Sequence, residues 1–259
     1  MAQPPMNSSR LTVVVRRRAR RLALWNGAIW AVGNGLCSTT LVVYLALELQ
    51  APRAGLSVGL ILAMRHLIGA LQLGAPAVIR DGSSRKRLCL AGFTGSGLAS
   101  LALPPAAAPG VLPSPGASLG ALVGLWCAHH LMQYLGMVAF WSWLADVAPR
   151  RIRGRFLGLR GRWLAAGEAA GAAAAGLHAW GLGNLRPDLP GWMPYLLPAL
   201  AGALLMLASV VPVARMAAAP AAAPRGVEPA GRASSSLAST SRASNSRAAN
   251  LLAPWRSRR

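Results

Sequence analysis

Apolar residues gather in six long runs that are separated by short polar stretches. The runs cover residues 22–48, 55–79, 88–111, 119–145, 163–183 and 193–214. Each supplies the ~20 residues that a helix rising about 1.5 Å per residue needs to cross a hydrocarbon core of about 30 Å. Lipid leaves backbone groups no other partners, and the runs lack the alternation of barrel strands. The sequence therefore predicts an all-α fold, a polytopic transmembrane bundle of about six helices.

Prolines interrupt the third run. They are Pro104, Pro105, Pro109, Pro113 and Pro115. We expect regular helix only up to Leu103, because proline lacks an N–H and clashes with the preceding turn. Basic stretches at 80–87 and 150–162 flank the third and fourth runs, and the positive-inside rule places both stretches in the cytoplasm. The chain must then cross twice between them, so both runs are predicted to span.

Composition agrees with a membrane protein, since 54% of the residues are hydrophobic and only 13% are charged. A net charge of +21 would ordinarily suggest nucleic acid, but the basic residues lie between apolar runs instead of along one face. With both ends inside, only Arg53, Arg65 and Arg186 fall outside the cytoplasmic segments. We expect a multi-pass protein of a bacterial inner membrane, with lipid and not nucleic acid as its partner, and with both termini cytoplasmic.

The two ends differ from the apolar domain at 22–214. Residues 1–21 are basic and are read as a cytoplasmic N-terminus, because the apolar run after them is too long for a signal peptide. Residues 215–259 are rich in Ala, Pro, Ser and Arg and contain almost no large apolar residues, so they are predicted to form a disordered basic tail.

The segment after the second run resembles a transporter motif. Asp81, Arg85 and Lys86 occupy matching positions of the Asp-Arg-x-Gly-Arg-Lys signature, which lies between helices two and three of the major facilitator superfamily. Gly82 and Ser84 depart from it, standing where the family has a basic residue and a glycine. The alternative is a generic basic loop.

A second segment of the same family lies between helices four and five. Asp146, Pro149, Arg153, Gly154 and Arg155 fit the pattern Asp-x-x-Pro-x-x-x-Arg-Gly-Arg. Proline is expected to stop the helix, glycine to permit a tight turn, and the arginines to pair with the aspartate and with helix C-terminal carbonyls.

The resemblance covers residues 22–214 and corresponds to the N-terminal six-helix half of such a transporter. It implies two inverted three-helix repeats, a substrate path near the membrane midplane, and alternating access against a second half. The motif residues above would then belong to cytoplasmic gating loops. Because a second half is not part of this sequence, a fragment, a half-transporter that forms a homodimer, and a degenerate remnant all remain open.

Ionisable residues inside membrane helices are costly and suggest function. Arg65 and His66 fall near the middle of the second run, and His129, His130 and Gln133 near the middle of the fourth. Such a cluster can bind an anionic substrate or relay protons. The alternative is a structural polar network that joins helices.

Glu168 lies in the fifth run among small residues that permit close helix contact, Gly167, Gly171 and Gly176. It is read either as a proton-coupling carboxylate or as an ion-pair partner of Arg65 or of a loop arginine.

The leading hypothesis is a permease or half-permease for an unidentified small solute, and not an enzyme. One alternative is a membrane-embedded enzyme, such as an intramembrane serine protease that uses Ser96 with His178. Another is a non-transporting scaffold whose basic tail contacts anionic lipid. No cofactor is expected: phosphate-binding motifs are absent, and adjacent histidines project about 100° apart on a helix, which is poor geometry for one metal.

Overall fold

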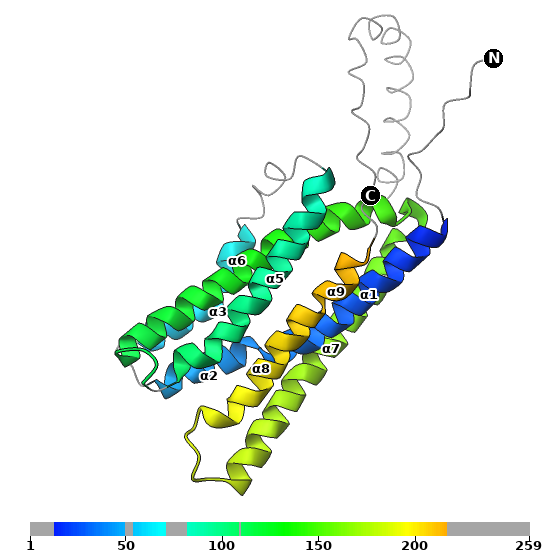
Figure 1. Ribbon diagram of the computed structural model, residues 1–259. Helices are drawn as coiled ribbons and strands as arrows, with labels where there is room; N and C mark the ends of the chain where they lie inside the picture. Colours follow the sequence, from blue (N-terminus) through cyan, green and yellow to red (C-terminus); the bar gives the residue numbers. More distant parts are fainter. Residues whose placement is uncertain (1–12, 50–53, 71–81, 109, 217–259) are drawn as a thin grey trace, which may run out of the picture. The chain divides into compact units, whose positions relative to one another are not determined.

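The computed structural model describes residues 13–49, 54–70, 82–108 and 110–216, all within the first of two units of the chain, Met1–Ala221 (Figure 1). In these ranges the protein is entirely helical, as predicted. The helices are α1 (Val13–Leu36), α2 (Thr39–Glu48), α3 (Ala54–Ala70), α5 (Gly82–Ala107), α6 (Pro115–Val147), α7 (Arg150–Leu185), α8 (Met193–Ala208) and α9 (Val210–Ala214). The predicted tail from 217 onward lies outside the described residues.

Three helical stretches in the described part of the chain are long and apolar enough to cross a membrane. They are Val13–Glu48, which combines α1 and α2, Arg85–Ala107 within α5, and Met193–Ala214, which combines α8 and α9. The apolar part of α3, Gly55–Ala70, is shorter. These helices indicate a membrane-embedded protein, whereas the predicted number of six crossings is not established by length and composition.

Helices α6 and α7 are the longest, at 33 and 36 residues, but neither is among these three stretches. Two histidines and Gln133 interrupt α6, and α7 is dominated by Ala and Gly and carries Glu168. Polar side chains and small residues both reduce mean hydropathy. Of these residues, His130, Gln133 and Glu168 line the cavity described below.

The prolines shape the link between α5 and α6 differently from expectation. Helix α5 continues through Pro104 and Pro105 to Ala107, so the predicted end at Leu103 is wrong. Pro104 and Pro105 each remove one backbone hydrogen bond, and the helix ends two residues later. Pro115 then opens α6 in the first turn, where its missing N–H costs nothing, and Ser114 Oγ accepts from the N–H of residue 117 at 3.2 Å.

In their described parts, from Gly82 and from Arg150 onward, the two basic segments are helical and not looped. Helix α5 begins at Gly82, and α7 begins at Arg150 immediately after Pro149, so only two residues separate α6 from α7. Proline does end α6 as predicted. Gly154 is an exposed residue within α7, and the tight turn predicted there is wrong. Arginine and lysine are good helix formers, which explains why these basic stretches extend the helices.

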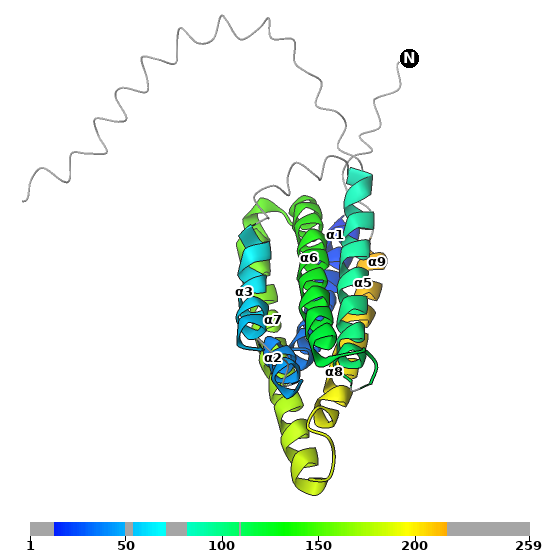
Figure 2. The same cartoon turned by 90° about the vertical axis from the view of Figure 1, so that its left-hand side faces the viewer.

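Packing pairs the helices. Helix α5 lies along α6, α1 lies along α7, and α8 contacts both α1 and α5, while α3 packs against α6 and α2 (Figures 1 and 2). One apolar cluster includes Phe93, Phe140 and Trp143, and another includes Ile61 and Leu122. Helix α6 contributes to both clusters, and the segment between these contributions lines the cavity described below.

Helices α1 and α7 meet backbone to backbone. A Cβ on Gly171 would collide with the backbone of α1, and one on Gly35 would collide with the carbonyl oxygen of Glu168. A Cβ on Gly167 would lie 2.7 Å from an alanine Cβ of α1. The close contact predicted for these α7 glycines is therefore present, whereas Gly176 faces open space. The contact fixes the position of Glu168 relative to α1.

Candidate functional site

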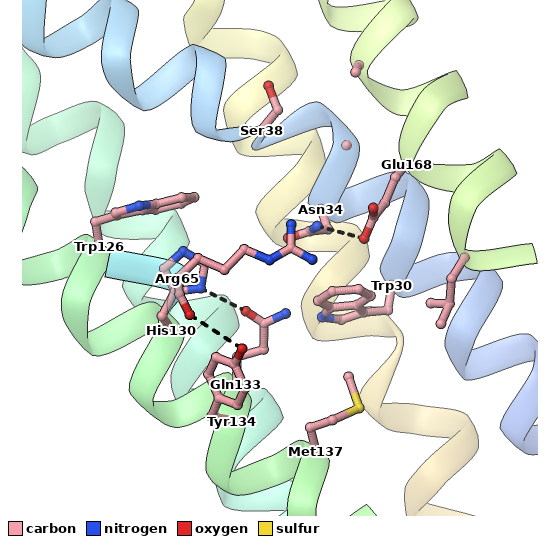
Figure 3. A pocket seen from close by; sticks show the side chains of 13 residues that line it. Trp30, Asn34, Ser38, Arg65, Trp126, His130, Gln133, Tyr134, Met137 and Glu168 are labelled. Atoms are coloured by element: carbon pink, nitrogen blue, oxygen red, sulfur yellow. Dashed lines mark hydrogen bonds between the residues drawn. The ribbon is translucent and has the colours of Figure 1, made fainter. Parts of the chain in front are cut away.

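A cavity of about 400 Å³ lies among α1, α3, α6 and α7 (Figure 3). Each helix contributes polar or aromatic side chains to its lining. The residues discussed below are Trp30, Asn34, Arg65, Trp126, His130, Gln133, Tyr134, Met137, Leu164 and Glu168. Concave sites with mostly apolar walls and a few convergent polar groups are typical of small-molecule binding.

Arg65 is the cation of this cavity. It comes from α3, and its side chain extends across the space toward Asn34 of α1 (Figure 3). Its backbone carbonyl oxygen accepts a long hydrogen bond of 3.4 Å from Tyr134 Oη. Among the described residues, none forms a hydrogen bond or ion pair with its guanidinium. The charge is thus available to a ligand.

Glu168 is the anion of the cavity and comes from α7. Its Oε1 accepts a hydrogen bond of 3.1 Å from Asn34 Nδ2. No arginine in the described part of the chain pairs with it, so the ion pair considered from the sequence, with Arg65 or with a loop arginine, is not formed. An uncharged amide holds the carboxylate instead, which leaves its charge uncompensated.

His130 and Gln133 complete the polar lining from α6. His130 Nδ1 lies 3.2 Å from Gln133 Oε1. Because an amide oxygen only accepts, Nδ1 is the donor in this bond. The ring of Trp126 meets the His130 ring edge-on, with centroids 4.5 Å apart. The contact and the hydrogen bond fix the histidine at the cavity wall.

His129 has a different environment from its neighbour. It is fully buried and is not among the residues that line the cavity. Its Nδ1 lies 3.0 Å from Ser96 Oγ and 2.8 Å from Ser100 Oγ, both on α5, and its ring stacks on Trp126. His129 therefore belongs to a polar network that joins α5 and α6.

The same network contains Ser96, the nucleophile considered for an intramembrane protease. Ser96 bonds His129 and not His178, whose Nε2 has no hydrogen-bond partner in the described structure. Ser96 is also completely buried, which leaves a substrate no approach to its hydroxyl. The serine–histidine pair considered from the sequence is not formed.

His66 is exposed and does not line the cavity. It follows Arg65 directly, and consecutive side chains on a helix project about 100° apart. The structure thus brings together four of the six sequence candidates, Arg65, His130, Gln133 and Glu168, and leaves His66 and His129 elsewhere.

Two residues of the transporter-like motifs bind the ends of other helices. Lys86 Nζ donates to the carbonyl oxygens of Ala214 and Met216 at 2.8 and 2.9 Å, where α9 ends. Arg153 Nη2 donates to the carbonyl oxygen of Ala145 at 2.7 Å, in the last turn of α6. Cations at helix C-termini satisfy orphan carbonyls and interact favourably with the helix dipole. The predicted pairing of an arginine with helix carbonyls is present.

The remaining motif residues are less informative. Arg85 is half-buried, and Arg155 is exposed. Asp146 lies in the last turn of α6, with a side chain outside the described part, and Asp81 lies outside the described residues altogether.

Sequence reasoning missed Asn34, the residue that positions Glu168. The signal was an amide between Gly33 and Gly35 in a largely apolar run. Such a residue has no charge to mark it, although a polar side chain flanked by small residues in a membrane helix favours an interhelical hydrogen bond.

No group of three or more His, Cys, Asp or Glu side chains in the described ranges is arranged to hold a metal. Comparison of the chain with family models, with curated proteins and with solved structures finds no match. The cavity brings together one cation, Arg65, and one carboxylate, Glu168, that do not pair with each other.

Proposed function

We propose that the protein is a membrane transport protein for a small solute, built as a six-crossing half-permease like the N-terminal half of a major facilitator superfamily transporter. The observation that carries this proposal is the cavity among α1, α3, α6 and α7, where Arg65 and Glu168 face one space without pairing. Charges within membrane helices are costly, and a binding site gives them a use.

Helix α6 fits a crossing despite its lower hydropathy. Its 33 residues extend roughly 50 Å, more than a hydrocarbon core of about 30 Å requires. Its polar side chains avoid lipid: His129 is fully buried, and His130 and Gln133 line the cavity. The residues that lower its hydropathy are therefore compatible with a membrane position.

Helix α7 carries large apolar side chains on its surface. Leu177 is 68% exposed and Trp180 is 70% exposed. Water penalises such exposure, whereas lipid does not, and a six-crossing topology places both side chains against the bilayer. Crossings by α6 and α7, together with one by the segment that contains α3, complete the six predicted from the sequence.

The loop between α7 and α8 has the low net charge expected on the outer side of the membrane. Arg186, one of the few basic residues expected there, forms two hydrogen bonds of 3.2 Å with the carboxylate of Asp188. The guanidinium holds the pKa of Asp188 below its ordinary value, so the pair stays charged but adds no net charge to the loop. A neutral outer loop agrees with the positive-inside rule.

Alternating access in this family needs two halves. A second copy of this chain or a separate six-helix protein would supply the other half in the proposed transporter. Cross-linking in native membranes followed by mass measurement identifies which of the two is present.

Counterflow tests the transport proposal in liposomes that contain the purified full-length chain, together with the separate second half where cross-linking identifies one. The solutes offered are labelled sugars, carboxylates, amines and amino acids. We expect accumulation of at least one class, a loss of roughly tenfold or more in Arg65→Met, and no loss in the control Arg162→Met, an exposed arginine of α7 outside the cavity. Accumulation of no class, or accumulation that Arg65→Met leaves unchanged, would contradict the proposal.

A further inference from the structure

Two opposite charges share the cavity without neutralising each other. The Arg65 guanidinium enters from α3, and the Glu168 carboxylate is held on α7 by Asn34 (Figure 3). No nitrogen of Arg65 lies within 4.0 Å of a carboxylate oxygen of Glu168. The two groups come from different helices, and the backbone contact between Gly35 and α7 places Glu168 beside α1.

This separation restricts the charge of a ligand. A solute with only a carboxylate is attracted by Arg65 but repelled by Glu168. A solute with only an ammonium group is attracted by Glu168 but repelled by Arg65. A neutral solute leaves both charges without a counter-ion as it displaces water from the cavity. A ligand that carries both charges compensates each of them.

The remaining lining limits the body of the ligand. Trp30, Trp126, Met137 and Leu164 provide apolar walls, and the volume of about 400 Å³ lies toward the lower end of the roughly 300–1,000 Å³ typical of small-molecule sites. His130 and Gln133 bond each other, and neither side chain brings a second carboxylate into the cavity. The lining suits a compact apolar group beside the two charged ends.

Resting on the proposed transport function, we infer that the substrate is a small zwitterion, a solute with one carboxylate and one ammonium group on a compact apolar body, as in an apolar amino acid. Arg65 binds the carboxylate through its planar fork of donors. Glu168 accepts from the ammonium group, with Asn34 holding the acceptor in place.

Four matched compounds test this inference on the purified full-length chain at mildly acidic pH. They are L-phenylalanine, its amide, which is a cation, its N-acetyl derivative, which is an anion, and the neutral N-acetyl amide. Binding is measured as competition and as ligand-induced thermal stabilisation. We expect the zwitterion to bind at least about tenfold more tightly than each of the other three, as expected for loss of one charged contact.

Two variants assign the two charges. In Arg65→Met the advantage of phenylalanine over its amide should vanish, while its advantage over the N-acetyl derivative remains. In Glu168→Gln the advantage of phenylalanine over the N-acetyl derivative should vanish, while its advantage over the amide remains. Arg162→Met and Glu48→Gln, exposed residues outside the cavity lining, are the matched controls and should bind all four compounds as the wild-type protein does.

The outcomes separate this inference from the transport proposal. Equal or tighter binding of the anion, the cation or the neutral compound overturns the zwitterion inference. Failure of all four compounds to bind, together with counterflow of another solute class, overturns it as well while transport stands. Failure of all four to bind, together with no counterflow of any class, overturns both.

Discussion

Lys86 and Arg153 are single residues that each fasten the end of another helix. Lys86 bonds two carbonyl oxygens where α9 ends, and Arg153 bonds one in the last turn of α6. Both belong to segments that resemble transporter motifs at the basic side of the protein. Their observed contacts are those of helix C-caps, so their first role is to hold helix ends together.

Replacing Lys86 with Met should lower stability by about 1 kcal/mol, because two helix-terminal carbonyls lose a charged donor. The matched control is Arg87→Met, which removes a neighbouring exposed arginine. Thermal unfolding of the purified protein in detergent should show a melting temperature lower by roughly 2–4 °C for the first variant only. Equal melting temperatures for the two variants would show that the Lys86 contacts contribute nothing.

Side-chain roles were only partly predictable from the sequence. The sequence places Arg65 and Glu168 within apolar runs, where charge suggests function, and both face the cavity. It cannot tell His129 from His130, because which one faces the cavity depends on how α5 packs against α6. The role of Asn34 was not predicted because it depends on a hydrogen bond with Glu168, which is distant in the sequence.

At the scale of whole helices, the contact between α1 and α7 determines where the carboxylate of the cavity lies. Glycines on both helices allow their backbones to meet. In membranes such close packing is a main source of helix association, because lipid and apolar side chains are equally hydrophobic.

Two glycines of α7 provide a matched test of this contact. Gly171→Ala places a methyl group against the backbone of α1 and should destabilise by about 1–3 kcal/mol. Gly176→Ala makes the same chemical change in open space and should stabilise by about 0.5–1 kcal/mol, the usual gain of Ala over Gly within a helix. Unfolding of both variants in detergent measures the difference, and shifts of the same sign and size would exclude tight α1–α7 packing.

Helix positions followed from hydropathy, but helix ends did not. All six apolar runs contain helix in their described parts. The observed helix ends differ from the predicted ones because hydropathy identifies only the apolar part of a helix and not its polar extension. Arginines continue α1 and α7 beyond their runs, and prolines near the end of α5 are tolerated. Those outcomes depend on helix propensity and on local hydrogen bonding.

At the scale of the molecule, the transport proposal depends on how often the chain crosses the membrane. Charge distribution predicts six crossings, whereas length and apolarity identify three stretches. The difference rests on α3, α6 and α7. In these two long helices His130, Gln133 and Glu168 line the cavity, and Gly167 and Gly171 pack against α1.

Cysteine labelling of the full-length protein in spheroplasts, with a membrane-impermeant maleimide, tests these crossings directly. Two exposed sites are predicted to face outward: Val111 in the link after α5, and Asn184 in the last turn of α7. Two other exposed sites are predicted to face the cytoplasm: Arg151 in the first turn of α7, and Arg215 directly after α9. Each is replaced by Cys. The native Cys37 and Cys89 are buried, and the partly exposed Cys127 is replaced by Ala in every variant to remove its background.

Six crossings with both termini inside require labelling of Val111→Cys and Asn184→Cys in intact spheroplasts. They also require labelling of Arg151→Cys and Arg215→Cys only after the membrane is permeabilised. If Val111→Cys and Arg151→Cys react from the same side, α6 does not cross the bilayer, and the account of a solute cavity inside a six-crossing transporter is wrong.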